Sequence, residues 1–323
     1  MSMKNAINEC AKQFAYEPEI QNVDAFKPAE NIVVNGMGGS HLAADIIGMV
    51  QPVRDFHVVS DYGMSVFSEE RMRDHLFIAS SYSGNTEEAI SFAHSVHEHR
   101  LNLAIIAVKG ELIDFAIQNH IAYVQLPDTG IQPRSALGFS LLGLARLIND
   151  EVLLKDIHHL GDVLNPSAWE KQGTELAGVL KDSVPVIYAS SRNRTIAYNW
   201  KIKCNETGKI PAFYNVFPEL NHNEMNGFDV QTSNRHLSEQ FHFLFITDDT
   251  GDSRIEKRMH ITKKLYTDRK LAVTEVPLEG QAHLERTFNS LLLADWTALA
   301  IAEQYGTESE EVPMVEEFKK LIL

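Results

Sequence analysis

The segment Ser81-Tyr82-Ser83-Gly84-Asn85-Thr86-Glu87-Glu88 links an apolar run at residues 76–80 to a helical pattern at residues 86–99. Within that pattern, apolar side chains recur three and four positions apart, which is typical of a helix with one buried face. A short buried strand, a glycine-containing turn and such a helix make up one unit of an α/β fold. The segment therefore predicts a strand whose carboxyl end opens directly onto the start of a helix.

Strand-like runs and helical patterns alternate on both sides of this segment. We expect strands at residues 31–34, 56–60, 76–80, 103–108, 121–126, 184–189, 212–215, 241–246 and 272–276. We expect helices at residues 86–99, 111–118, 135–154, 195–206, 253–267 and 282–302, and one more that follows a glycine turn and ends at residue 50. This alternation predicts an α/β protein with mainly parallel sheets flanked by helices.

A polar stretch at residues 158–171 interrupts the pattern, and the same order of elements starts again beyond it. A chain of 323 residues is long enough for two ordinary domains. We therefore expect an N-terminal domain over residues 1–155 and a related C-terminal domain over residues 165–323.

The composition excludes several classes of protein. Hydrophobic residues make up 44% of the chain and charged residues 23%, as in globular proteins. The net charge is −15 and no stretch is rich in Lys and Arg, so no nucleic-acid partner is expected. Cys10 and Cys204 are too few for a disulfide framework or a multi-cysteine zinc site. Neither a signal peptide nor a membrane-spanning run is visible, so we expect a cytoplasmic enzyme or binding protein.

The turn after the strand at residues 76–80 has the composition of an anion-binding site. It carries three hydroxyl side chains, those of Ser81, Ser83 and Thr86. Gly84 lets the backbone approach a ligand, and the following helix N-terminus offers unpaired N–H groups and a partial positive charge. Ordinary capping is the alternative, since Asn85 and Glu88 have capping-box spacing. The carboxyl end of a strand is where open α/β sheets bind ligands, which favours a phosphate site.

A second glycine turn, Gly36-Met37-Gly38-Gly39-Ser40, follows the strand expected at residues 31–34. With Asp61 after the next strand, it matches the start of a dinucleotide-binding fingerprint, but His41 stands where the third glycine belongs. No Gly-Lys-Ser/Thr follows, which excludes a Walker loop. We interpret this turn as a second backbone nest in the same crevice as the Ser/Thr turn.

Three further charged or titratable side chains stand out. Arg134 begins an apolar helix, where a surface salt bridge is the alternative interpretation. Glu206 ends a predicted helix just before Gly208, its expected C-cap, and a carboxylate there opposes the helix dipole. His222 lies in the loop Asn221-His222-Asn223-Glu224, whose composition suits either acid–base chemistry or a hydrogen-bonded loop histidine. No histidine spacing indicates a metal site, and none is expected.

Several of these segments, taken together, resemble one family. They are residues 36–40, 81–86, 133–134, 205–206, 212–215 and 221–224. Their order and spacing are similar to those of the bifunctional phosphoglucose/phosphomannose isomerase family, which is built from two sugar isomerase (SIS) domains. The resemblance extends from about residue 31 to the C-terminal segment at residues 312–319. The Ser/Thr turn marks SIS proteins in general, whereas the Asn-Glu and Asn-His-Asn-Glu segments make the match specific.

The resemblance implies a homodimeric aldose–ketose isomerase of glycolysis and gluconeogenesis. Such an enzyme converts glucose 6-phosphate or mannose 6-phosphate to fructose 6-phosphate through a cis-enediol(ate), without a metal or an organic cofactor. The substrate-binding residues implied are Gly39, Ser40, Ser81, Ser83 and Thr86. The catalytic residues implied are Arg134, Glu206, His222 and Lys319.

Each catalytic residue has a role in this resemblance. Glu206 would move a proton between C2 and C1, and Arg134 would stabilise the developing oxyanion. His222, contributed by the neighbouring subunit, would assist ring opening. Lys319, or its neighbour Lys320, would contact the ring oxygen.

Two departures and three alternatives remain. Residues 111–126 show nothing distinctive of the family, and His41 is the second departure. His41 replaces a usually smaller residue and would crowd the phosphate or add a donor to it. The first alternative is another SIS enzyme, such as an amino-sugar phosphate isomerase or deaminase. The second is a non-catalytic phosphosugar-binding regulator, which would not need Glu206 and His222 together. An NAD-dependent dehydrogenase is disfavoured by the broken fingerprint.

Overall fold

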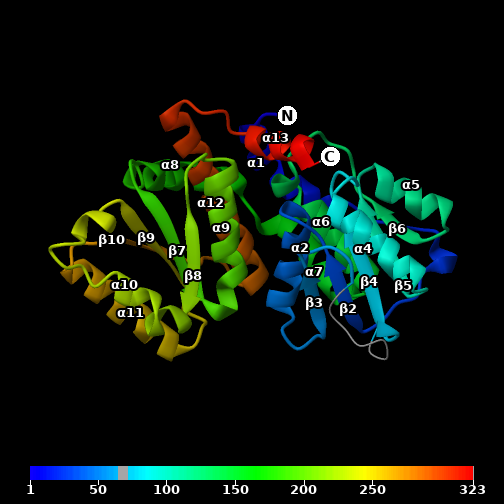
Figure 1. Ribbon diagram of the computed structural model, residues 1–323, viewed down its shortest axis with the longest axis horizontal. Helices are drawn as coiled ribbons and strands as arrows, with labels where there is room; N and C mark the ends of the chain where they lie inside the picture. Colours follow the sequence, from blue (N-terminus) through cyan, green and yellow to red (C-terminus); the bar gives the residue numbers. More distant parts are fainter. Residues whose placement is uncertain (65–71, 323) are drawn as a thin grey trace. The chain divides into compact units, whose positions relative to one another are not determined.

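The computed structural model describes residues 1–64 and 72–322 (Figure 1). The chain divides into two compact units. Unit 1 consists of Met1 and Asn8–Leu164, and unit 2 consists of Ser2–Ile7 and Asn165–Leu323. The first helix, α1 (Met3–Asn8), therefore lies almost entirely in unit 2. In sequence, unit 1 is inserted into unit 2.

Unit 1 is built on a six-stranded sheet with the order β1-β6-β5-β4-β2-β3. Its strands are β1 (Ile20–Gln21), β2 (Asn31–Asn35), β3 (Phe56–Val59), β4 (His75–Ser80), β5 (Asn102–Ala107) and β6 (Ala122–Gln125). Strand β1 is antiparallel to β6, and the other pairs are parallel. The turns that follow the neighbouring strands β2 and β4 consequently meet at one edge of the sheet.

Helices cover both faces of this sheet. They are α2 (Gly39–Val50), α4 (Glu87–Glu98), α5 (Glu111–Gln118), α6 (Leu137–Ile148) and α7 (Glu151–Val163), with short turns η1 (Cys10–Ala15), η2 (Val23–Ala25) and η3 (Pro133–Ser135). Helices α4 and α5 pack against one face, where Phe77 and Phe92 belong to one buried cluster. Helix α6 covers the other face, since the Cα of Gly143 faces the side chains of Val124 and Ile106.

The single helix predicted over residues 135–154 is wrong. The chain forms helix α6, turns at Asn149, and starts helix α7. Asn149 adopts the left-handed conformation (φ 59°, ψ 42°) that ends helices. Asp150 then caps α7, because its carboxylate accepts a hydrogen bond from the backbone N–H of Leu153 at 2.9 Å.

Unit 2 contains a four-stranded, fully parallel sheet with the order β10-β9-β7-β8. Its strands are β7 (Val184–Ser190), β8 (Phe213–Phe217), β9 (Phe241–Thr247) and β10 (Ala272–Pro277). Its helices after α1 are α8 (Glu170–Val179), α9 (Arg194–Glu206), α10 (Glu224–Gly227), α11 (Ser253–Asp268), α12 (His283–Tyr305) and α13 (Pro313–Ile322). Shorter turns are η4 (Pro166–Trp169), η5 (Ser191–Asn193), η6 (Glu219–His222) and η7 (Arg235–Leu237).

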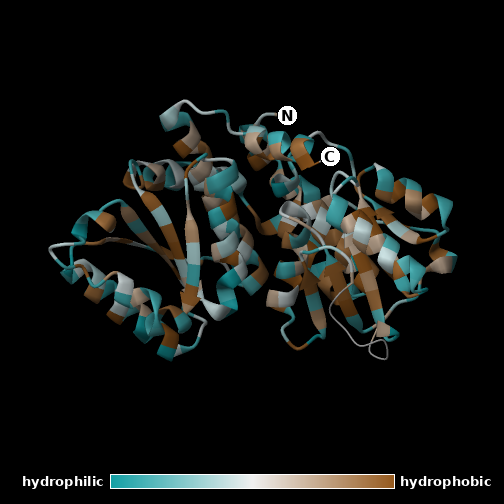
Figure 2. Ribbon diagram, viewed as in Figure 1, coloured by the Kyte–Doolittle hydropathy of each residue, from teal (hydrophilic) through white to brown (hydrophobic). Residues whose placement is uncertain are grey.

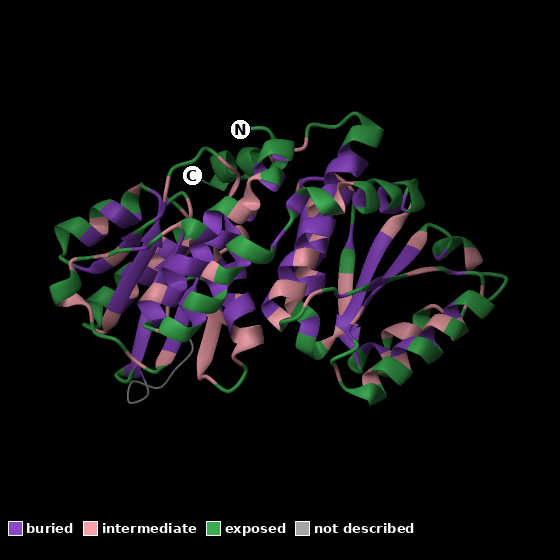
Figure 3. Cartoon of the chain, turned by 180° about the vertical axis from the view of Figure 1, so that it is seen from behind, coloured by how far each residue is buried: buried purple, intermediate pink, exposed green. Residues whose placement is uncertain are grey.

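The core of unit 2 is rich in aromatic rings. Tyr188, Phe217 and Phe245 of the sheet pack with Tyr266 of α11 on one face. On the α9 and α12 side, the indole N–H of Trp200 donates to Ser290 Oγ at 2.9 Å, which links these two helices. The central strands β4 and β5 of unit 1 and β7 and β9 of unit 2 are hydrophobic and mostly buried, whereas the edge strand β10 is only partly buried (Figures 2 and 3).

The predicted α/β class with mainly parallel, helix-flanked sheets is confirmed. Over the described part of the chain, no helix combines the length and the apolar character needed to cross a lipid bilayer.

Candidate active site

The Ser/Thr turn lies at the carboxyl end of β4 and gathers the three predicted hydroxyl groups. Ser81 Oγ lies 2.8 Å from Thr86 Oγ1 and 3.5 Å from Ser83 Oγ. The backbone N–H of Gly84 donates to Ser81 Oγ at 3.1 Å. Ser81 is completely buried, whereas Ser83 is exposed. The turn therefore presents a compact hydroxyl cluster that is open on one side.

The capping-box interpretation of this turn is wrong. Thr86, rather than Asn85, is the N-cap residue of α4, and no side-chain hydrogen bond caps this helix end. Asn85 instead caps the neighbouring helix, since its Oδ1 accepts from the backbone N–H of Glu111 at 3.0 Å. The N-terminus of α4 thus keeps the electrostatic character that attracts anions.

The glycine turn after β2 packs against this hydroxyl cluster. Ser40 Oγ accepts a hydrogen bond from the backbone N–H of Tyr82 at 2.9 Å. The hydroxyl of Ser80 donates to the carbonyl oxygen of Ser40 at 2.9 Å. A Cβ on Gly39 would lie 3.0 Å from the backbone nitrogen of Arg134, a tight contact that favours glycine at this close approach of the two backbones. All six predicted residues of unit 1 are thereby brought to one edge of the sheet.

Arg134 is only 3% exposed, so the alternative of a surface salt bridge is wrong. Arg134 lies in turn η3. A residue far away in sequence holds this turn, since the side-chain amide of Gln13 donates to the carbonyl oxygen of Ser135 at 2.7 Å. A buried guanidinium stays charged, because its pKa lies far above neutrality. It therefore supplies a fixed positive charge beside the glycine turn.

His41, the second departure noted in the sequence, lies in the first turn of α2 and is 7% exposed. Its Nδ1 is 2.7 Å from Asp45 Oδ2, one helical turn further along. The imidazole of His41 thus makes its hydrogen bond within its own helix, α2.

In unit 2, Glu206 is the last residue of α9 and is half-buried. The ammonium group of Lys209 donates to the backbone carbonyl of Glu206 and, at 2.6 Å, to that of Glu311. This double contact fixes the end of α9 to the segment that leads into α13. Gly208 is not the C-cap that we expected, because Thr207 takes that position; the left-handed conformation is at Lys209, with φ 57°.

His222 ends turn η6 and is exposed, between two anchored neighbours. On one side, the amide of Asn221 donates to Thr262 Oγ1 at 2.9 Å. On the other, the carboxylate of Glu224 accepts from the hydroxyl of Tyr188 at 2.5 Å and from the amide of Asn215. The backbone around His222 is held on both sides while its imidazole remains accessible.

The Tyr188 hydroxyl is a neutral donor to this carboxylate. Burial, followed by the neighbouring Tyr266, raises the pKa of Tyr188 well above its usual value of 10.0. Lys319 and Lys320 are both exposed on α13, and Lys319 Nζ lies 2.8 Å from Glu316 Oε1.

Sequence reasoning missed a polar cluster at the carboxyl edge of the unit 2 sheet. The amide of Asn193 donates to Asp248 Oδ2 at 2.9 Å, and its Oδ1 lies 2.8 Å from His283 Nε2. Burial, followed by the charge of Arg192, holds the pKa of His283 below its usual value of 6.5. The available signal was Ser190-Ser191 directly after a strand, which parallels Ser80-Ser81.

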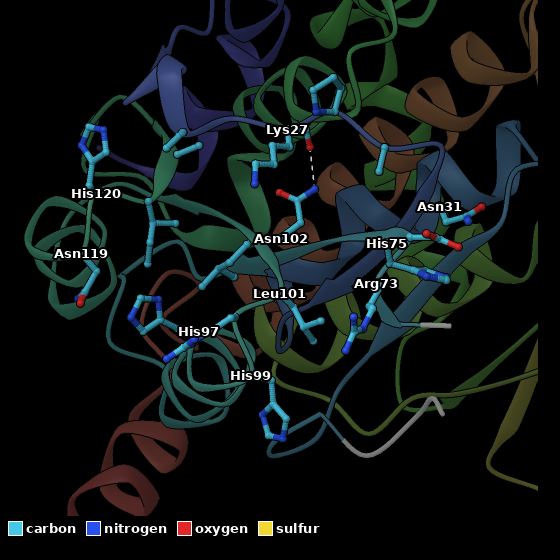
Figure 4. Close-up of a pocket in the computed structure, with 18 of the residues that line it drawn as sticks. Lys27, Asn31, Arg73, His75, His97, His99, Leu101, Asn102, Asn119 and His120 are labelled. Atoms are coloured by element: carbon cyan, nitrogen blue, oxygen red, sulfur yellow. Dashed lines mark hydrogen bonds between the residues drawn. The ribbon is translucent and has the colours of Figure 1, made fainter. Parts of the chain in front are cut away.

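A cavity of about 970 Å³ lies at the amino-terminal edge of the unit 1 sheet (Figure 4). It is lined by the first residues of three parallel strands, Asn31, His75 and Asn102. Ser81 follows the last residue of β4, so this cavity is at the opposite edge from the hydroxyl cluster. Cavity size therefore does not identify the candidate site of unit 1, whereas the convergence of hydroxyl groups does.

Comparison with known proteins agrees with this arrangement. The class of protein that the comparisons indicate is that of the sugar isomerase (SIS) domains. Residues 170–322 match the family model of the bacterial phospho-glucose isomerase C-terminal SIS domain. The fold is also similar to tagatose-6-phosphate ketose/aldose isomerase from Escherichia coli, with a TM-score of 0.69, 15% identity and coverage of 95% of this chain and 94% of that one.

Two curated relatives narrow the assignment. The chain is 31% identical over 314 residues to a bifunctional phosphoglucose/phosphomannose isomerase from Aquifex aeolicus, covering 95% of this chain and 94% of the relative. It is 32% identical over 302 residues to a protein of the same name from Thermoplasma volcanium, covering 91% of each. The chain belongs to the bifunctional phosphoglucose/phosphomannose isomerase family.

Proposed function

We propose that this protein interconverts glucose 6-phosphate and mannose 6-phosphate with fructose 6-phosphate. Membership of the isomerase family supports the reaction. The observation that carries the proposal is the cluster of three hydroxyl groups at the N-terminus of α4, with Ser81 Oγ at 2.8 and 3.5 Å from the other two. Hydroxyls, backbone N–H groups and a helix dipole together suit the 6-phosphate that all three sugars share.

In this proposal Ser81, Ser83 and Thr86 bind the phosphate oxygens, and Gly39 and Ser40 complete the cradle through their contacts with Arg134 and Tyr82. Phosphate is the constant end of the substrate. Binding it therefore leaves the configuration at C2 free to vary between glucose and mannose.

The chemical step is a proton transfer between two carbon atoms. The carboxylate of Glu206 takes the proton from C2 of the open-chain aldose, and the carbonyl oxygen at C1 gains negative charge. Arg134 stabilises that charge as a fixed, buried cation. Return of the proton to C1, with transfer of the O2 proton to O1, gives the ketose. C1 is reduced as C2 is oxidised, so the sugar itself balances the electrons and no redox cofactor is required.

The shared intermediate accounts for two substrates. Glucose and mannose 6-phosphates differ only in configuration at C2, and loss of the C2 proton makes that carbon planar. Both therefore give the same cis-enediol(ate), provided the base reaches the proton in each epimer. Proximity and orientation of Glu206 then control the rate.

Ring opening must precede this step. We assign it to His222 of the partner subunit in a homodimer, with Lys319 at the ring oxygen. The exposed position of His222 between two anchored residues supports donation to another chain. We also assign the enzyme to the cytoplasm, because a charged sugar phosphate does not cross the apolar interior of a membrane.

The first test measures fructose 6-phosphate formed from glucose 6-phosphate and, separately, from mannose 6-phosphate, each with and without EDTA. Comparable turnover of both sugars in EDTA is expected. Turnover of only one sugar would still be consistent with Glu206 as the base, but it would show that the pocket distinguishes the C2 epimers. If neither sugar is turned over but amino-sugar phosphates are converted, the alternative SIS enzyme is supported. If phosphosugars are bound and none is converted, the non-catalytic regulator is supported.

Mixed dimers test the assignment of His222. Chains carrying Glu206→Gln and chains carrying His222→Ala are each expected to be inactive. If His222 acts across the interface, a heterodimer of the two keeps one complete site, which combines Glu206 of one chain with His222 of the other. Random 1:1 reassembly gives half heterodimers, so about a quarter of wild-type activity should return. No recovery in verified heterodimers would place His222 in the same chain as its Glu206.

A further inference from the structure

The amino-terminal edge of the unit 1 sheet carries a cluster of metal-ligating side chains remote from the proposed catalytic residues of that unit. Among residues 1–64 and 72–322, Asp55, His57 and His75 place one ligand atom each within 4.8 Å of one another. His57 Nε2 lies 2.6 Å from Asp55 Oδ1, and His75 Nε2 lies 3.9 Å from Asp55 Oδ2. The imidazole rings of the two histidines are 6.4 Å apart.

Strand register explains why these residues meet. Asp55 directly precedes β3, and its carbonyl accepts from the backbone N–H of Ile32 in β2 at 3.0 Å. His57 is two residues further along, so its side chain lies on the same face as that of Asp55. His75 begins β4 and pairs with Asn31, the first residue of β2. The cluster thus spans β3 and β4 across the start of β2.

We infer that Asp55, His57 and His75 form a binding site for a divalent transition-metal ion such as Zn²⁺. Two imidazoles and one carboxylate favour zinc, cobalt, nickel or copper over magnesium or calcium, which prefer oxygen ligands alone. Zinc takes nitrogen and oxygen ligands at about 2.0–2.2 Å, which sets ligand atoms roughly 3.3 Å apart in a tetrahedral site. The His57 Nε2–Asp55 Oδ1 distance of 2.6 Å and the His75 Nε2–Asp55 Oδ2 distance of 3.9 Å lie on either side of that value, each to a different oxygen of the carboxylate.

The burial of the three side chains suits a site that is fixed on one side and open on the other. The His75 side chain is 2% exposed and has a defined position, whereas those of Asp55 and His57 are each 38% exposed. Small rotations of the two exposed side chains bring their ligand atoms onto an ion held at His75. His75 also lines the cavity of about 970 Å³, from the side of Asn31 and Arg73 (Figure 4). Water completes the coordination from the exposed side.

The site is separate from the proposed isomerase chemistry in unit 1. His75 begins β4 and Ser81 follows its end, so the two are about 20 Å apart at roughly 3.3 Å per residue. Bound metal would connect the edge strand β3 to β4 and stabilise unit 1 without contacting the hydroxyl cluster. The proposal consequently does not depend on the proposed function, and EDTA-resistant turnover is compatible with it.

The test is a Zn²⁺ titration of the full chain, freed of metal by EDTA and competed against a chromophoric chelator. Wild-type protein is expected to bind one equivalent tightly, with at least a tenfold loss of affinity in Asp55→Asn and in His57→Gln. Both changes are at partly exposed positions, which avoids altering the buried His75. His99→Gln is the matched control, since His99 is exposed and lines the adjacent cavity. Zn²⁺ should also raise the Tm of the wild type and the control but not of the two variants.

The titration has two results that would overturn the inference. One is the absence of Zn²⁺ binding below about 1 mM to correctly folded wild-type protein. The other is binding that His99→Gln weakens as much as His57→Gln does, which would assign the metal to scattered surface histidines. Circular dichroism of the metal-free variants verifies that each is folded.

Discussion

Gly84 gives the phosphate turn its shape. Its φ is 74°, and a Cβ at this position would lie 1.6 Å from the carbonyl oxygen of Lys109. Both the backbone conformation and the space exclude a side chain. We predict that Gly84→Ala lowers the free energy of unfolding by about 2 kcal/mol or more, because strain and a steric clash add. It should also weaken phosphosugar binding.

The matched control is Gly178→Ala in helix α8, where a Cβ would meet nothing within 4 Å. Alanine there should be neutral or stabilise the protein by up to about 1 kcal/mol. Urea denaturation of both variants measures the difference. Equal effects of the two substitutions would contradict the argument from the Lys109 contact.

Glu206 allows the most direct test of the proposed chemistry. Glutamine keeps the shape of the side chain but cannot accept a proton from carbon. We predict that Glu206→Gln lowers kcat by a factor of about 10²–10⁴ with little change in substrate affinity. Steady-state kinetics and substrate titration measure the two quantities separately. Glu303→Gln, an exposed change on α12, should leave both unchanged. Wild-type kcat in Glu206→Gln would remove Glu206 from the role of base.

At the scale of elements, a single carboxylate joins strands β7 and β8 to the His222 loop. Glu224 accepts from Tyr188 of β7 and from Asn215 of β8. We predict that Tyr188→Phe lowers the free energy of unfolding by about 1.5–3 kcal/mol, because it removes a hydrogen bond to a charged group in the core. Hydrogen exchange across residues 219–227 should quicken with it.

Tyr305→Phe provides the comparison for this prediction. The Tyr305 hydroxyl accepts from the backbone N–H of Asp182 at 2.7 Å, but the side chain is 41% exposed. Its loss should cost no more than about 0.5 kcal/mol. A Tyr188→Phe protein as stable as the Tyr305→Phe protein would show that Glu224 does not hold the loop through Tyr188.

The cluster of Asn193, Asp248 and His283, at the ends of β7 and β9 and the start of α12, makes unit 2 sensitive to acid. The pKa of His283 is lowered in the fold, so the unfolded chain binds its proton at higher pH than the native state does. The stability from neutral His283 is complete above pH 6.5 and declines as the pH falls below that value. The pKa of Asp248 is lowered despite burial, because Asn193 and Thr250 donate hydrogen bonds to its carboxylate. Its contribution to stability is therefore lost only as the pH falls below about 3.8.

Urea midpoints at pH 7.5 and 5.0 test this dependence. The wild-type midpoint should fall with pH, and His283→Gln should fall less because it lacks the titrating group. His260→Gln, an exposed change in the same unit, should follow the wild type. If the urea midpoint of His283→Gln fell between pH 7.5 and 5.0 as much as that of the wild type, His283 would not be the cause of the acid sensitivity.

Elements with a strong periodic pattern could be predicted from the sequence, and those fixed by local backbone geometry could not. The central strands β4, β5 and β9 are near-continuous apolar runs, so their positions were clear. Strand β1 has only two residues, too few to carry a pattern. The break between α6 and α7 depends on the left-handed Asn149 within an otherwise unbroken helical pattern.

The site residues also divide into those that a sequence pattern predicts and those that only the folded structure brings together. The two turns of unit 1 were predicted to meet because each follows a strand of one parallel sheet. The burial of Arg134 was not predicted, since its turn is packed by residues far away in sequence, such as Gln13, which donates to the carbonyl of Ser135. Nor did spacing indicate a group formed by Asp55 and His75, which only strand pairing brings together.

For the whole molecule, the insertion of unit 1 into unit 2 makes helix α1 an essential part of a distant core. Ile7 is 3% exposed, and Lys4 lies 2.7 Å from Glu170 and over the ring of Trp296. We predict that Ile7→Ala destabilises unit 2 by about 2–5 kcal/mol, the cost of a core cavity. Hydrogen exchange should quicken in α8 and α12. Asn5→Ala, an exposed change on the same helix, should have no such effect. If Ile7→Ala instead quickened exchange only in unit 1, the assignment of α1 to unit 2 would be contradicted.

The placement of α1 also has a consequence for the nascent chain. The backbone N–H of Met3 donates to Glu310 Oε1 at 3.0 Å, so α1 is bound in part by a residue translated 307 positions later. At about 5–20 residues per second, the ribosome needs roughly 15–60 s to bring Glu310 out. Until α8 and α12 are made, the apolar face of α1 has no native partner in unit 2, although all of unit 1 is translated before them. A chaperone that binds exposed apolar segments would have an extended opportunity to bind α1.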